Sequence, residues 1–169
     1  LTEGKSLPTV AKVPFRDVFL KYKQEVKNPK GKVALYAGCL IDFVYPKIGE
    51  GIIAGLNEKG YEVVFPDGQS CCGAPATYMG DRANARKLAI LNIKAMEAEK
   101  VDYVVTGCPT CTHALIDSYK ELVADDPVLL ARAEELSGKS RDFSKLLFDL
   151  GGLTPGGDGV PMKITYHDS

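Results

Sequence analysis

The five cysteines of this 169-residue chain fall into three groups that lie far apart in the sequence. Cys39 stands alone, the doublet Cys71-Cys72 is followed by Gly73, and Cys108 and Cys111 form a Cys-x-x-Cys pair. Thirty-one residues separate Cys39 from the doublet, and 34 separate Gly73 from Cys108. Only a folded domain can bring three such loops together, and a thiol cluster assembled in this way is most often a metal site.

The sequence around these thiols has the pattern of an α/β domain. Short runs of β-branched and aromatic residues, bounded by Gly, Pro or Asp, predict buried strands at 33–36, 61–65 and 103–105. Helical patterns alternate with them, at 15–26, 45–59, 77–100, 109–123 and 126–150, the last with a break near Ser137-Gly138. Strands that alternate with helices predict a three-layer fold, with a mostly parallel sheet flanked by helices. Each cysteine group then follows the carboxyl end of a strand, at the rim where open α/β sheets bind ligands.

The order of one cysteine, a Cys-Cys-Gly and a Cys-x-x-Cys at these separations resembles the cysteine-rich CCG domain family, over residues 32–121. That family includes the catalytic subunit of heterodisulfide reductase and the iron–sulfur subunits of glycolate, lactate and glycerol-3-phosphate dehydrogenases. The resemblance implies an iron–sulfur cluster-binding domain of a multi-subunit oxidoreductase. Segments 7–8 and 14–17 resemble the connector of the dehydrogenase subunits, which favours electron relay from a flavoprotein that oxidises a 2-hydroxy acid such as glycolate or lactate. A heterodisulfide reductase-like subunit is the alternative.

The resemblance also implies the ligands of the cluster. All five cysteines match the family's motif, and these are Cys39, Cys71, Cys72, Cys108 and Cys111. In the heterodisulfide reductase branch, five such cysteines hold a non-cubane four-iron, four-sulfur cluster. Neighbouring side chains of an extended chain point to opposite faces, so the doublet can reach one metal group only at a sharp turn, where Gly73 can adopt positive φ.

Two other kinds of site remain open for the same thiols. Zinc held by four thiolates would make the chain a zinc-stabilised scaffold domain without a redox role. A redox-active disulfide between Cys108 and Cys111 is the other alternative, because a helix that begins at Pro109 favours the thiolate form of a preceding cysteine. The disulfide alone leaves Cys39 and the doublet unexplained.

The rest of the chain divides into a lead-in arm at 1–31, the CCG domain at 32–150, a Gly- and Pro-rich linker at 151–161 and a last segment at 162–169. Residues 163–169 parallel residues 32–38 at a constant offset of 131. This family commonly carries two CCG domains in tandem, so the last segment resembles the first strand of a truncated second CCG domain. A plain final strand is the alternative.

Composition limits the partners and the compartment. The net charge of −1 does not indicate a nucleic-acid-binding protein, and no apolar run is long enough to insert into a membrane. An odd number of thiols without secretion features favours a cytoplasmic protein, which partners would bring to the inner face of the membrane. The expected partners are a flavoprotein dehydrogenase subunit, other iron–sulfur subunits and a second CCG domain of the same chain. No Ser-His-Asp set, HExxH motif or carboxylate pair indicates a hydrolase, and the domain is not expected to turn over substrate alone.

Overall fold

The computed structural model describes residues 8–23, 25–151, 163 and 165, and its centre is a parallel sheet. The strands are β1 (Gly31–Leu35), β2 (Tyr61–Val64), β3 (Tyr103–Thr106) and β4 (Ser140–Asp142). Their order is β2-β1-β3-β4, and every pairing is parallel. Val33 sets the register at the middle of the sheet, because it lies opposite Val63 on one side and Tyr103 on the other. The predicted α/β fold is confirmed.

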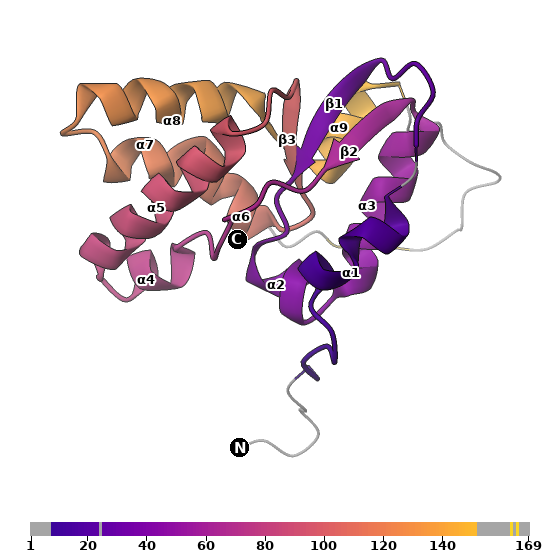
Figure 1. The fold of residues 1–169 in the computed structure, drawn as a ribbon. Coiled ribbons are helices and arrows are strands. Elements are labelled where there is room, and N and C mark those ends of the chain that lie inside the picture. Colours follow the sequence, from indigo (N-terminus) through magenta and orange to yellow (C-terminus); the bar gives the residue numbers. More distant parts are fainter. Residues whose placement is uncertain (1–7, 24, 152–162, 164, 166–169) are drawn as a thin grey trace.

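Helices cover both faces of this sheet, as Figure 1 shows for α5, α7 and α8 on one side and α1 and α3 on the other. The helical segments are α1 (Phe15–Tyr22), α2 (Gly38–Phe43), α3 (Pro46–Glu58), α4 (Ala74–Tyr78), α5 (Arg82–Glu97), α6 (Pro109–His113), a π-helical turn (Ala114–Ser118), α7 (Tyr119–Leu122), α8 (Pro127–Lys139) and α9 (Phe143–Asp149). Among the described residues, no helix is long and apolar enough to cross a membrane.

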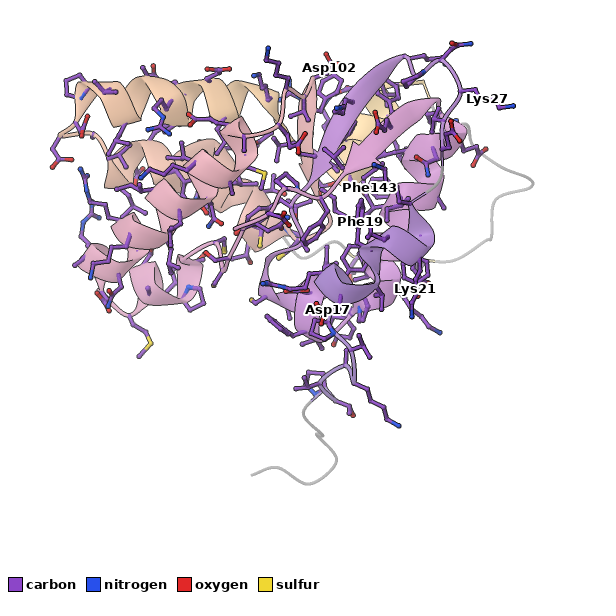
Figure 2. The ribbon with its side chains drawn as sticks, in the orientation of Figure 1. Asp17, Phe19, Lys21, Lys27, Asp102 and Phe143 are labelled. Atoms are coloured by element: carbon purple, nitrogen blue, oxygen red, sulfur yellow. The ribbon has the colours of Figure 1, made fainter. Side chains whose placement is uncertain are left out.

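Alternation along β1 divides the core between the two faces. Ala34 and Tyr36 belong to the core beneath α5, α7 and α8, which also contains the buried thiols. Val33 and Leu35 point the other way, into the core beneath α1, α3 and α9. Figure 2 labels two aromatic residues of this second core, Phe19 from α1 and Phe143 from α9. Both faces of β1 are therefore buried, as a central parallel strand requires.

Three details differ from the sequence prediction. The helix expected over 77–100 is two helices, because Gly80 takes φ +80° and Asp81 then caps α5 by accepting from the N–H of Asn84. The break expected near Ser137-Gly138 lies further on, since α8 runs to Lys139. Ser137 there donates to the carbonyl of Ile116 at 2.7 Å, which ties α8 to the π-helical turn. Strand β4 and helix α2 were not predicted at all.

The predicted arm contributes to the second core. Phe15 is fully buried and stacks on Tyr22 with ring centroids 6.4 Å apart, and Phe19 is also buried. Most of the predicted linker and nearly all of the segment 162–169 lie outside the described residues. The division of the chain into arm, domain, linker and truncated second domain therefore stays a prediction.

Candidate metal centre

The cysteine groups follow three strands that are neighbours in the sheet. Cys39 comes after β1, the doublet after β2, and Cys108 after β3, so all lie beyond the carboxyl ends of their strands. The thiol of Cys39 neighbours that of Cys71, and the thiol of Cys111 neighbours those of Cys72 and Cys108. In the described structure, the sheet order thus gathers thiols that are up to 72 residues apart in sequence.

The five thiols form an inner group and an outer group. We define the inner trio as Cys72, Cys108 and Cys111, which are all buried, with 4%, 9% and 3% of their surface exposed. We define the outer pair as Cys39, which is exposed, and Cys71, which is half-buried. The inner trio belongs to the apolar core beneath α5, whereas the outer pair faces solvent.

The electrostatics of the inner trio centre on Cys111. Hydrogen bonding from the Cys111 thiol, assisted by the backbone N–H groups of Cys111 and Thr110, lowers the pKa of Cys108 to about 6 against the opposing effect of burial. The same thiol is the main reason that the pKa of Cys72 falls to about 7. The pKa of Cys111 itself is raised, because this thiol keeps its proton between Cys108 and Cys72 and is buried. Two of the three inner thiols therefore favour the thiolate form near neutral pH.

The outer pair behaves differently. Burial, and then the neighbouring Cys71 thiol, raise the pKa of Cys39. Like Cys111, Cys39 is thus a thiol that a metal group would have to deprotonate against the local environment.

Two glycines give the backbone its shape around the thiols. Gly73 takes φ +84° directly after the doublet, at the N-cap position of α4, and this supplies the sharp turn that the sequence predicted. Gly38 takes φ +57°, and a Cβ atom added to it would lie 2.9 Å from the Sγ atom of Cys111. The first cysteine loop therefore approaches the third one so closely that a side chain at residue 38 would press on a thiol.

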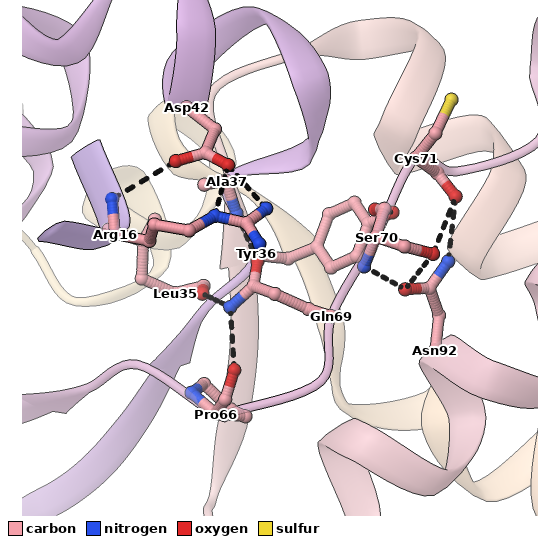
Figure 3. Close-up of polar contacts among 10 residues, drawn as sticks. All are labelled: Arg16, Leu35, Tyr36, Ala37, Asp42, Pro66, Gln69, Ser70, Cys71 and Asn92. Carbon is pink, nitrogen blue, oxygen red and sulfur yellow. Dashed lines mark hydrogen bonds and ion pairs between the residues drawn. The ribbon is translucent and has the colours of Figure 1, made fainter. Parts of the chain in front are cut away.

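Buried polar side chains surround the doublet (Figure 3). The carboxamide of Asn92 contacts Ser70 and the carbonyl of Cys71, and Gln69 contacts the end of β1. Neither Gln69 nor Asn92 was predicted from the sequence. For Asn92 a signal was present, because it occupies the apolar face of α5 together with Ala85, Ala89 and Met96, where an amide must find buried partners.

The histidine nearest the Cys-x-x-Cys pair does not add a ligand to this group. His113 is exposed, and its Nδ1 atom lies 3.2 Å from Oδ2 of Asp117 on the same helical segment.

The donor set fits an iron–sulfur group in its chemistry. All five candidate ligands are soft sulfur atoms, which iron–sulfur clusters and zinc prefer and which Mg²⁺ and Ca²⁺ do not. Within the described residues, no three His, Cys, Asp or Glu side chains are grouped so that they could hold one metal ion. The thiols of the described residues are neighbours at one edge of the sheet, and they do not form a complete ligand shell.

One buried hydroxyl near the thiols is also available. Thr106 lies at the end of β3, on the same sheet face as Val104 and two residues before Cys108. Its side chain is fully buried, and its Oγ1 atom has no hydrogen-bond partner in the part of the chain that the structure describes. Buried hydroxyls without a partner are costly, so this one is a candidate donor to a group bound at the rim.

The chain is similar to one domain family and to several known proteins. The family model CCG, described as a cysteine-rich domain, matches residues 33–116, which include all five cysteines. Lactate utilization protein A of Exiguobacterium sp. is 35% identical over 137 residues, which are 81% of this chain and 56% of that protein. The protein of the same name from Bacillus pumilus is 36% identical over 138 residues, covering 82% of this chain and 57% of that protein. The chain spans little more than half the length of these relatives.

Proposed function

Because residues 33–116 belong to the CCG family of cysteine-rich domains, we propose that this chain binds an iron–sulfur cluster within a multi-protein oxidoreductase. The observation that carries the proposal is the gathering of five thiols from three loops at the carboxyl edge of the sheet. The proposed ligands are Cys39, Cys71, Cys72, Cys108 and Cys111. A bound cluster would supply one-electron transfer.

The protein's own residues have distinct tasks in this proposal. The inner trio offers two thiols that ionise readily, so it would bind metal first. The outer pair lies at the solvent side, where an electron donor or acceptor can approach. The buried phenols of Tyr36 and Tyr119 and the core beneath α5 exclude water from the inner side.

The name of the relatives supports the choice of substrate class. They are lactate utilization proteins, and we propose that this chain serves the oxidation of a 2-hydroxy acid such as lactate, with electrons delivered by a flavoprotein partner. We further propose other iron–sulfur subunits and a second CCG domain of the same chain as partners, and a cytoplasmic location. An ordinary four-iron, four-sulfur cubane takes four thiolates, so five candidate ligands favour a non-cubane four-iron, four-sulfur cluster in this proposal.

Anaerobic reconstitution with iron and sulfide tests the proposal directly. The reconstituted protein should be brown, absorb beyond about 400 nm and bind about four irons per chain. Uptake of zinc without iron, giving a colourless protein, would contradict it and support the zinc-stabilised scaffold instead.

A variant of the outer pair separates the two outcomes further. Four thiolates are enough for zinc, so Cys39→Ser should leave zinc binding intact if the site is a zinc site with Cys39 as the spare thiol. If all five thiols serve a cluster, Cys39→Ser should lower the iron content or change the visible spectrum. Leu40→Ala is the matched control, because Leu40 is the exposed neighbour on the same helix and has no thiol.

A further inference from the structure

Two carboxamide side chains lie on either side of the thiol doublet in the fold, and both are buried. Gln69 is 5% exposed and precedes the doublet in the loop after β2, whereas Asn92 is 0% exposed and comes from α5. Neither is a candidate metal ligand. Burying an amide without partners is unfavourable, so the hydrogen bonds of each residue indicate what it holds in place.

Gln69 connects the first cysteine loop to the second. Its Oε1 atom accepts a hydrogen bond from the N–H of Ala37 at 2.8 Å, two residues before Cys39. Its Nε2 atom donates to the carbonyls of Leu35 and Pro66, both at 3.1 Å. Both amide protons and the amide oxygen are therefore used to join the end of β1 to the loop that leads into the doublet.

Asn92 connects the second cysteine loop to the segment that follows the third. Its Oδ1 atom accepts from the N–H of Ser70 at 2.8 Å, and its Nδ2 atom donates to the carbonyl of Cys71 at 2.9 Å. The same Nδ2 atom donates to the hydroxyl of Tyr119 at 2.8 Å, and Tyr119 begins α7, the continuation of the helical segment that opens at Cys108. The two contacts with the doublet loop are drawn in Figure 3.

A third buried side chain completes the hold on the loop. The hydroxyl of Tyr36, at the end of β1, donates to the carbonyl of Ser70 at 2.6 Å. The backbone N–H and C=O of Ser70 are thus both bonded to buried side chains, one from α5 and one from the sheet. The residue directly before the doublet has little freedom to turn.

We infer that Gln69 and Asn92 are positioning residues, which fix the three cysteine loops relative to one another before any metal is bound. In this arrangement the turn at the doublet is set by the protein and not by the ligand, and the inner trio stays assembled in the metal-free protein. The inference concerns the thiols themselves. It relies on the proposed function only where metal loading is measured.

The first test measures thiol reactivity in the metal-free, reduced protein. Asn92→Leu and Gln69→Met keep the approximate side-chain volumes and remove the hydrogen bonds. Iodoacetamide labelling followed by mass spectrometry gives the rate for each cysteine. We expect the Cys72 rate to rise about tenfold or more in both variants, because the loop opens locally, and to rise relative to the Cys108 rate.

Matched variants separate positioning from general loss of stability. Ile93→Val alters a fully buried neighbour on α5 that makes none of these hydrogen bonds, so its ratio of Cys72 to Cys108 labelling should stay within about twofold of the original protein. Asn92→Asp keeps an acceptor for the Ser70 N–H and should fall between Asn92→Leu and the unchanged protein. It also serves as the test if Asn92→Leu does not fold.

The labelling ratios and the iron contents of the variants test the inference. Labelling ratios equal to those of Ile93→Val in the Asn92 and Gln69 variants would overturn the inference. After anaerobic reconstitution, Asn92→Leu should hold less than about half the iron of the original protein, while Ile93→Val should match it. An original protein that binds no iron would refute the proposed function but leave the labelling result, and with it the positioning role, intact.

Discussion

Replacing Gly38 by alanine should damage both the stability of the domain and its thiol centre. Gly38 has φ +57°, which costs an L-residue about 1–2 kcal/mol. The added Cβ atom would also lie 2.9 Å from the Sγ atom of Cys111, and ordinary contact requires about 3.5 Å or more. Cys111 is 3% exposed, so its sulfur cannot move without disturbing packed neighbours, and such overpacking costs a further 1–3 kcal/mol or so.

Gly68 is a control that separates the cost of the contact with Cys111 from the cost of positive φ. Gly68 has φ +78°, and an added Cβ atom there would meet nothing within 4 Å. Gly68→Ala should therefore lose only about 1–2 kcal/mol, whereas Gly38→Ala should lose about 2–5 kcal/mol. Urea unfolding of the reduced, metal-free proteins measures both free energies of unfolding, with the slopes checked for equality.

Metal loading provides the second half of this experiment. Displacement of Cys111 should lower the iron bound after reconstitution by Gly38→Ala, while Gly68→Ala should load like the original protein. Equal free energies of unfolding and equal iron contents in the two variants would refute the reasoning, because they would mean that the close approach of Gly38 to Cys111 has no consequence.

Three further predictions concern other parts of the chain. Arg16→Met should lower the free energy of unfolding by roughly 1–3 kcal/mol in urea titrations, because the buried carboxylate of Asp42 loses the guanidinium bond at 2.6 Å. Among the described residues, this carboxylate then keeps only the Arg16 N–H, at 3.0 Å. Arg16→Lys should lose less, and an unchanged midpoint for Arg16→Met would contradict the role of this pair. The side chain and N–H of Asn84 lower the pKa of Asp81, so this contribution to stability is present above the unfolded pKa of about 3.9 and is lost as the pH falls through the folded pKa. Asp81→Asn should therefore flatten the stability profile of the metal-free protein between about pH 5 and pH 3, and parallel profiles would argue against it. Stripping a reconstituted cluster with a chelator and an oxidant should lower the Tm by roughly 2–4 °C for each kcal/mol of binding, and an unchanged Tm would show that the cluster does not bind the folded state preferentially.

The central strands could be predicted from the sequence because their residues carry a local signal. The expected strands at 33–36, 61–65 and 103–105 correspond to β1, β2 and β3 with differences of one or two residues at their ends. Valine-rich runs bounded by Gly, Pro or Asp leave few alternatives for a buried parallel strand. The position of the cysteine groups beyond these strands followed from the same signal.

Strand β4 and helix α2, which were not predicted, carry no such local signal. Strand β4 consists of Ser140, Arg141 and Asp142, which are poor strand formers, and it exists because β3 offers an unpaired edge between Val104 and Thr106. Helix α2 has six residues and no capping side chain, so its formation depends on packing against α1 and α3. Tertiary contacts determine both elements, and a single sequence does not display them.

In the candidate site, too, some features could be predicted from the sequence and others could not. The identity of the thiols could be read from their spacing, but their separation into an inner trio and an outer pair depends on burial, which the spacing does not encode. The same limit applies to Gln69, which bonds backbone groups of Leu35 and Ala37, at and just beyond the end of β1, more than 30 residues away.

Because of the strand order, the visible absorbance of a chromophore bound at the thiols would report on the unfolding kinetics of the sheet. Strand β1 lies between β2 and β3, so a chromophore bound by all three cysteine loops would bridge two separate strand junctions. Its absorbance would fall as soon as either junction opened, whereas circular dichroism of the helices would follow the whole domain. Stopped-flow unfolding monitored at both wavelengths would then reveal whether the sheet separates before the helices melt, without any added label.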